Sequence, residues 1–531
     1  MSYRPYPPPT RLHRLYDPVA DLPPDHLARW VEAVVEEAVT PPPHPPGRGQ
    51  SPYDPRLTIK VLVYGYATGI RSSRQLARLC RESLPFLFLT RGDHPSHTTL
   101  CDARREESAG IEAVWLGLFA VADRCGLKRL GHVVVDSSKF RANASDEAVL
   151  TAAEYEAMRA ELQRVLAEAE AVDAQEAATG RRLPPELGAP VPYEQMRDIV
   201  RRVRKRRAAE KREEPPAAAG EAPGAGSATP AGAAAAGPAP GRPVSARMRT
   251  QLRAALVALA LAIATGRKHL CLTDPDAEMM GEGRTKRVQE CHSFEVVVDR
   301  EAGLLVVGQT TQEGNDNARL EPLLAAAQAH EPDGVKAADA DCGYYSGDAL
   351  ARLIRAGIDL CVPDPHTACD LHRGQPIGTT RARTQGEVPL TYVAASDRYV
   401  CPEGNELRPR QQRQKWGQWV TIYRAVRDCR GCPRAGDCLQ QAGAARRTLC
   451  VGQEAELLEA ARQRFAAAAH QERYHHRGEV VERVFGFVRA VLGYHGWLLR
   501  GRDGVACEGR LFKVAYQVRK VHAAWAAAGA R

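Results

Sequence analysis

Apolar residues at helical spacing dominate both ends of the chain. Residues 26–39 show this pattern, and two or three short helices are expected between 56 and 105. The second of these begins at Ser72 or Ser73, which are good capping residues, after a turn at Gly69. A helix, a glycine-containing turn and a short helix outline a helix-turn-helix. The helical pattern returns in the C-terminal part, centred on residues 472–494.

Short β-branched runs lie between these helical ends. The run GHVVVD ends in a carboxylate, and the following SSKFRANAS is typical of a turn or a second strand. HSFEVVVD and GLLVVGQTT are separated by three residues and predict a hairpin. The expected strands are 131–136, 292–299, 303–311 and 335–344, and longer helices are expected at 154–173 and 247–265.

Two segments have a composition that sets them apart from the rest of the chain. Residues 213–243 are low-complexity Pro, Ala and Gly, which bury too little apolar area to fold, so they are predicted to be a linker. Residues 390–450 are polar and turn-rich and contain a group of cysteines, which indicates an inserted subdomain. The basic stretch 201–212 is better explained as a solvated helix face than as a DNA contact.

Composition narrows the class of protein. The chain has 73 Lys and Arg against 64 Asp and Glu, a formal charge of +9, which permits a nucleic-acid partner without requiring one. The longest apolar run, 254–264, is shorter than the roughly 18 residues of a membrane-spanning helix, so no membrane partner is expected. The N-terminal residues are polar and carry no apolar signal core. Together with 14 cysteines this favours a reducing, cytoplasmic location.

Three acidic residues could form a metal-dependent site. Asp136 and Asp341 end strand-like runs, and Glu482 lies in a helix among valines. Carboxylate oxygens are ligands for Mg²⁺ or Mn²⁺, and two such ions serve phosphodiester chemistry. Taken singly, each acid is more often a turn, a cap or a solvated residue. Asp339 is the main rival for the second position, because residues two apart share a strand face.

Four cysteines form a second candidate metal site. Cys429 and Cys432 have the Cys-x-x-Cys spacing of a zinc half-site, and Cys401 and Cys438 lie on either side of them. A closed four-cysteine site has no open position for substrate, so a bound Zn²⁺ would be structural. Four free thiols are the alternative.

Cations surround the second N-terminal helix. Arg71, Arg74 and Arg78 could contact DNA phosphates, as a helix-turn-helix would require. A small helical bundle with solvated arginines explains the same pattern equally well.

Several motifs in this order resemble the DDE transposases of bacterial insertion sequences. VVVDSSKFRANAS resembles their first-aspartate motif, and ADCGYYS resembles the second. Tyr474, Arg477, Glu482 and Arg489 follow the Tyr-Arg-Glu-Lys signature, with Arg489 in place of the usual Lys. DPRLTIKVLVYGYATGIRSSRQLARLC is similar to the helical DNA-binding domain at the head of these proteins, so the resemblance covers nearly the whole chain apart from the linker.

The resemblance implies an α+β fold with an RNase H-like mixed sheet flanked by helices. It implies Asp136, Asp341 and Glu482 as catalytic metal ligands, and Tyr474, Arg477 and Arg489 as contacts to DNA. The expected division begins with a helical DNA-binding domain at 1–110. The catalytic core follows at 111–150 and 271–385, interrupted by a helical spacer at 151–270. A cysteine-rich subdomain at 386–450 precedes the C-terminal helices at 451–531, which complete the core.

The implied activity is metal-dependent strand cleavage and strand transfer at the terminal repeats of the protein's own element. Double-stranded DNA is the expected partner, a homodimer or larger assembly is expected on DNA, and no small-molecule cofactor is required. Two alternatives stay open. One is an inactive or repurposed DNA-binding protein, although none of the three acids is missing. The other is a nuclease of the same fold that performs no strand transfer.

Overall fold

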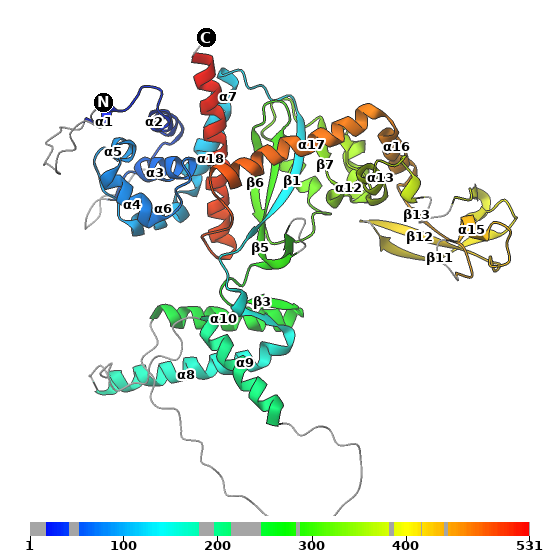
Figure 1. Cartoon of the computed structure of the whole chain (residues 1–531), viewed down its shortest axis with the longest axis horizontal. Helices are drawn as coiled ribbons and strands as arrows, with labels where there is room; N and C mark the ends of the chain where they lie inside the picture. The colour runs from blue at the N-terminus through cyan, green and yellow to red at the C-terminus, as the bar shows by residue number, and fades with distance from the viewer. Residues whose placement is uncertain are drawn as a thin grey trace, which may run out of the picture.

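The computed structural model describes residues 17–41, 52–179, 196–213, 246–282, 287–381, 387–415, 417–439 and 444–529. These residues form a helical N-terminal region, a mixed central sheet, a helical spacer and a second sheet (Figure 1). The mixed α/β architecture with a helical N-terminal region is therefore confirmed. Apart from residue 213, the linker predicted at 213–243 lies outside the described residues.

The N-terminal region is built from short helices with clear start signals. Ser72 caps α4 as predicted, Ser96 caps α6, and a proline follows the cap Asp54 of α3. Their apolar faces share one core with α7 and the C-terminal α18. The helices are α1 (Pro18–Asp21), α2 (Leu27–Ala38), α3 (Pro55–Ala67), α4 (Ser73–Glu82), α5 (Leu84–Thr90), α6 (His97–Glu106), α7 (Ser108–Arg124) and α18 (Gly501–Gly529).

The central sheet has the order β4-β5-β1-β7-β8, with β6 also paired to β5. β1 is antiparallel to β5 and parallel to β7, and β7 is parallel to β8. The predicted hairpin is present as β5 and β6. Residues 137–141 continue β1, because β5 pairs with it as far as Arg141. The strands are β1 (His132–Arg141), β4 (Glu278–Glu282), β5 (Arg287–Asp299), β6 (Leu305–Thr311), β7 (Ala337–Ala340) and β8 (Asp359–Cys361).

Helices cover both faces of this sheet. On one face, Val134 and Phe140 of β1 share a core with α17 and α18, and α17 crosses the sheet in Figure 1. On the other, Val133 and Val135 pack with α11 and α12. This alternation follows from the two-residue period of a strand. The helices that follow the sheet strands are α11 (Leu320–Gln328), α12 (Gly347–Arg355), α13 (Pro365–Arg373), α16 (Ala455–Gln463) and α17 (Ala468–Gly486), and a π-helical turn, Phe487–Val491, extends α17.

The spacer has a hydrophobic core of its own, below the sheet in Figure 1. It contains β2 (Val149–Thr151), α8 (Tyr155–Thr179), α9 (Met196–Glu213), α10 (Ala246–Thr265) and β3 (His269–Cys271). The basic stretch expected to be a solvated helix face lies in α9, where Val203 is buried and Arg201, Arg202, Arg204 and Lys205 are exposed.

Among the described residues, α10 is one helix long and apolar enough to cross a membrane by length and composition alone. Two arginines in the window Met248–Thr265 precede the apolar run 254–264, so the unbroken run in the sequence is shorter than the apolar window of the helix. This is weak evidence for a membrane span, because the core helix of a soluble protein passes the same test. Leu252 and Leu259 of α10 pack in the spacer core, and 28% of the window is buried.

A second sheet is inserted between α13 and α16 and projects from the central sheet (Figure 1). Its order is β13-β12-β11-β10-β9, and every pairing is antiparallel. We refer to it as the β-subdomain. Its elements are β9 (Thr391–Val393), β10 (Arg398–Val400), β11 (Glu406–Lys415), β12 (Gln418–Ala425), α15 (Ala435–Cys438) and β13 (Thr448–Gly452).

Candidate active site

Asp136 lies in the middle of β1, directly after three fully buried valines. It shares the strand face of Val134, which is the face covered by α17. Its side chain is 24% exposed, and its Oδ2 lies 3.5 Å from Nη1 of Arg477 on α17. Burial raises the pKa of Asp136 to about 6, with Arg477 opposing the shift and Asp341 adding to it. The carboxylate is therefore held in a setting that favours a neutralising cation.

Asp341 is brought beside Asp136 by the parallel pairing of β1 and β7. Val135 is opposite Ala340 in the register, so the next residue on each strand is one of the two aspartates. Asp341 caps the short turn Cys342–Tyr344, and its Oδ1 accepts a hydrogen bond of 2.9 Å from the Gly343 amide. The two carboxylates thus meet where β7 ends, although 205 positions separate them in the sequence.

Glu482 lies on α17, the helix that also carries Arg477. The buried Val481 and Val484 fix this helix on the core, while Glu482 itself is exposed. The described residues contain no group of three or more His, Cys, Asp or Glu side chains gathered as metal ligands, so Glu482 is not gathered with the two aspartates. The structure therefore unites Asp136, Asp341 and Arg477, and leaves Glu482 outside this cluster.

The basic residues of the signature lie against the same strand. Arg489 donates from Nη2 to Ser138 Oγ at 2.7 Å and lies over the Phe140 ring, at 4.9 Å from its centroid. The Arg477 guanidinium is 5.3 Å from the ring centroid of Tyr474, and burial raises the pKa of Tyr474 to about 12. Two Arg477 nitrogens, Nε and Nη1, are buried without a hydrogen bond in the described part of the chain. This guanidinium therefore has unused donors beside Asp136.

Asp339, the rival to Asp341, is engaged in a different way. Its buried carboxylate accepts hydrogen bonds from His132 at 2.9 Å, Arg300 at 2.8 Å and Arg473 at 2.7 Å. Burial alone would raise the pKa of Asp339, but His132 and Arg473 outweigh it and hold the pKa below its ordinary value. Arg300, Arg473 and His132 thus occupy the carboxylate of Asp339, whereas Asp341 accepts one backbone hydrogen bond.

Three further aspartates, Asp274, Asp276 and Asp316, make contacts that hold parts of the fold together. Asp316 pairs with Lys139 at 3.1 Å and accepts a hydrogen bond from Ser137. Asp274 is fully buried against His292 at 3.0 Å, and Asp276 accepts a hydrogen bond from the Arg502 amide at the start of α18. These contacts agree with turn or supporting positions.

The N-terminal arginines fall into two groups. Arg71 is only 13% exposed, and its guanidinium is 3.1 Å from the buried Glu508 of α18 and 4.4 Å from the centroid of the Tyr494 ring. It joins the N-terminal helices to the rest of the protein. Arg74 and Arg78 are exposed on α4, where Arg78 also lies 3.5 Å from Glu82. Of the three predicted phosphate contacts, Arg74 and Arg78 are therefore the ones that present their charge to solvent.

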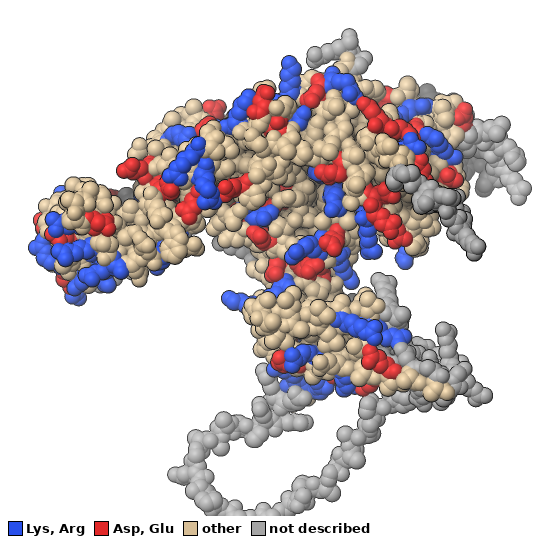
Figure 2. Space-filling view, turned by 180° about the vertical axis from the view of Figure 1, so that it is seen from behind, with Lys and Arg blue, Asp and Glu red and all other residues tan. Residues whose placement is uncertain are grey.

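A basic surface that the sequence analysis did not single out lies on the β-subdomain. Nearly every residue of β11 after Leu407 is exposed, and Lys and Arg gather on this lobe, at the left of Figure 2. We call the exposed arginines of β11 and β12 the hairpin arginines: Arg408, Arg410, Arg413 and Arg424. The signal was present in the sequence as LRPRQQRQK, but an all-polar strand lacks the alternation that identifies a half-buried one.

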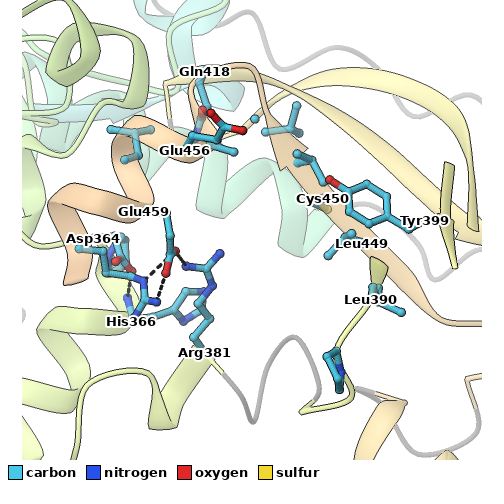
Figure 3. Close-up of a pocket in the computed structure, with 18 of the residues that line it drawn as sticks. Asp364, His366, Arg381, Leu390, Tyr399, Gln418, Leu449, Cys450, Glu456 and Glu459 are labelled. Carbon is cyan, nitrogen blue, oxygen red and sulfur yellow. Dashed lines mark hydrogen bonds and ion pairs between the residues drawn. The ribbon is translucent and has the colours of Figure 1, made fainter. Parts of the chain in front are cut away.

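A cavity of about 540 Å³ lies between the β-subdomain, α13 and α16 (Figure 3). Asp364 lines it and caps α13, and Glu459 forms ion pairs with Arg381 and Arg462. These charges neutralise one another, and Asp136, Asp341 and Glu482 do not line the cavity.

Two family models match separate parts of the chain. Residues 400–522 match the family model of a transposase DDE domain, and residues 17–106 match that of a transposase domain, DUF772. No curated protein matches the chain. Each match covers less than half of the chain, and the two segments are similar to transposase domains. The first match includes Glu482 and the signature around it, whereas Asp136 and Asp341 lie outside both.

Proposed function

We propose that this protein is a metal-dependent transposase that binds the terminal repeats of its own insertion sequence, cleaves the DNA there and joins the freed 3′ end to a target. The observation that carries the proposal is the pairing of Asp136 with Asp341 beneath the helix that bears Arg477 and Glu482. The two matches to transposase domains support this class of reaction.

The central sheet supports an RNase H-like core. The core strands are counted here without the short β2, β3 and β4. The central sheet is then a three-stranded antiparallel unit, β6-β5-β1, extended by the parallel β7 and β8. Asp136 is then on the first strand and Asp341 directly follows the fourth. The spacer and the β-subdomain are insertions into this core, which accounts for the long separation of the three acids.

Asp136, Asp341 and Glu482 would hold Mg²⁺ or Mn²⁺. The donor set fits a hard cation, because two carboxylates lie side by side and the one guanidinium near them makes no hydrogen bond to Asp136. When bound, the ions supply charge neutralisation and activation of the attacking oxygen in phosphoryl transfer. Glu482 would have to turn from solvent toward the aspartates for this, and DNA on the same face provides a reason for it to do so.

The chain's own cations would hold the DNA around this cluster. Arg477 has buried nitrogens that make no hydrogen bond among the described residues, and Arg489 is held against β1 by its hydrogen bond to Ser138, two residues beyond Asp136. Both can neutralise phosphates next to the scissile bond. Arg74 and Arg78 on α4 and the hairpin arginines would contact phosphates farther away. We leave Arg71 out of this set because its guanidinium forms an ion pair with the buried Glu508.

Two element ends must be held together during transposition, so we also propose that at least two copies assemble on DNA. We propose that they act in the cytoplasm, on the nucleoid.

The test is cleavage and joining of a labelled terminal-repeat duplex with Mg²⁺ or Mn²⁺. Asp136→Asn, Asp341→Asn and Glu482→Gln should each reduce cleavage by at least about 100-fold while DNA binding persists. Glu479→Gln is the matched control, since Glu479 is an exposed acid on the same helix that contacts His476; it should cut normally. Cut ends without joined products would indicate a nuclease, and binding without any cutting would indicate a DNA-binding protein.

A further inference from the structure

Four cysteines from distant parts of the β-subdomain line one cavity of about 350 Å³. Cys401 follows β10, Cys429 and Cys432 follow β12, and Cys438 ends α15. Cys429 and Cys438 are buried, and all four are free thiols.

The backbone around the cysteines is already shaped to hold sulfur atoms. The Asn405 amide donates to Cys401 Sγ at 3.3 Å, and the Asn405 side chain donates to Cys429 Sγ at 3.5 Å. The chain turns tightly after Cys401 and after Cys429. The Gly404 amide donates to the Cys401 carbonyl, and the Cys432 amide donates to the Cys429 carbonyl. Donors aimed at sulfur favour the thiolate, which is the form that binds metal.

A buried cation faces the same cavity. Arg447 is 4% exposed, and its Nη1 donates to the Cys438 carbonyl at 2.7 Å. Its Nε is buried without a hydrogen bond, and no carboxylate pairs with it among the described residues. A buried guanidinium without a counter-charge is costly, so an anionic group is expected beside it.

The β-subdomain also has very little core. Among the described residues its cluster of buried apolar residues comprises Leu407, Tyr423, Ala425 and Cys429, with these residues partly buried against it: Leu390, Tyr399, Leu439, Leu449 and Val451. A unit of this size with so few buried side chains is normally held by disulfides or by a structural metal. The four thiols are free, which leaves the metal.

We propose that Cys401, Cys429, Cys432 and Cys438 bind one structural Zn²⁺, with Arg447 as the buried counter-charge. Four thiolates and one Zn²⁺ carry a net charge of −2, which the guanidinium partly neutralises. The thiols release their protons on binding, and no electron transfer occurs. The sulfur atoms line the cavity without being gathered as ligands, so they must close by a small movement onto the ion. The site is independent of the carboxylate cluster and of the proposed DNA reaction.

The first test is the zinc content of the purified full-length protein, measured under reducing conditions by elemental analysis. One zinc per chain is expected, and Cys432→Ser or Cys401→Ser should reduce it to near zero. Cys450→Ser is the matched control, because Cys450 lies on β13 of the same subdomain and does not line this cavity; it should retain the metal. A metal-free wild type, or equal loss in the control, would overturn the proposal.

Substitution by Co²⁺ keeps the test valid if a cysteine variant fails to fold. The wild-type protein should then show the visible absorption of a tetrahedral four-sulfur cobalt site. A spectrum typical of oxygen or nitrogen ligands would reject the four-cysteine assignment.

Arg447 has a test of its own. Arg447→Gln should weaken zinc binding about 10- to 100-fold in competition with a chromophoric chelator, and Arg447→Lys should recover part of the loss. Arg430→Gln is the control, since Arg430 is exposed nearby and pairs with Asp428. If Arg447→Gln binds zinc as tightly as the wild-type protein does, Arg447 is not the counter-charge.

Discussion

Asp339 and Asp341 lie two residues apart and yet differ in burial and in hydrogen-bond partners. Asp339 is buried against Arg300 and Arg473, so Asp339→Asn should leave charges uncompensated and cost about 3 kcal/mol of unfolding free energy. Asp341 is half-buried and accepts one backbone hydrogen bond, which Asn can also accept. Asp341→Asn should therefore abolish cleavage and leave stability nearly unchanged. Urea unfolding and the cleavage assay measure the two effects.

The opposite result would reverse the assignment of the second ligand. If Asp339→Asn folds normally but does not cut, and Asp341→Asn still cuts, Asp339 is the metal ligand. The hydrogen bonds from His132, Arg300 and Arg473 to Asp339 would then have to break in the DNA complex.

Glu331 is a buried acid that makes stability depend on pH. Burial raises its pKa to about 7, and the nearby Asp299 adds to the shift. Below about pH 4.5 the carboxyl is protonated in both the folded and unfolded states, so it costs nothing. As pH rises toward 7 the unfolded state ionises first, and the folded protein loses up to about 3 kcal/mol of stability.

Glu331→Gln should remove this pH dependence. The variant should match the wild-type protein near pH 4.5 and gain stability over it progressively up to about pH 8, as measured by urea unfolding at each pH. A constant difference across this range would show that the carboxyl does not titrate in the folded protein.

At the scale of elements, the sequence identified most helices and strands but not their neighbours. The β-branched run before Asp136 and the cap at Ser72 are local signals, and both elements form where expected. Arg71 looked like a phosphate contact because its partner, Glu508, lies more than 400 residues away. The saturation of Asp339 likewise depends on His132, Arg300 and Arg473, which only the folded chain brings together. The resemblance gave the candidate site, and no local pattern pairs Asp136 with Asp341.

The β11–β12 hairpin is the element whose role is easiest to test. Arg410 and Arg413 are exposed on β11, and phosphate contacts make DNA affinity depend on salt. The double variant Arg410→Gln/Arg413→Gln should weaken binding to any duplex and lower the slope of log affinity against log salt by about 2. Arg430→Gln, which removes an exposed and paired arginine from the same subdomain, should change neither quantity.

If the slope stays the same and only affinity for one sequence falls, the hairpin contacts bases. If neither changes, DNA does not reach this lobe.

At the scale of the molecule, the spacer is separable from the rest. Its core shares no buried residue with the two cores of the central sheet, and the chain leaves and re-enters at adjacent points. The Leu272 amide donates to the Ala148 carbonyl at 3.0 Å, so a short loop can close the gap left by residues 149–271. A separate core of this kind is expected to unfold as its own cooperative unit.

Replacement of residues 149–271 by a short Gly-Ser loop should therefore leave the central sheet folded. Calorimetry of the full chain should show a transition that is missing from the shortened protein, while the main transition keeps its midpoint within a few degrees. The cleavage assay then assigns the spacer's role: retained cutting with lost joining would indicate that it aligns the two DNA ends. Collapse of the main transition would show that the spacer supports the central sheet, for example through the hydrogen bonds that Arg267 donates to the Pro275 and Ala277 carbonyls.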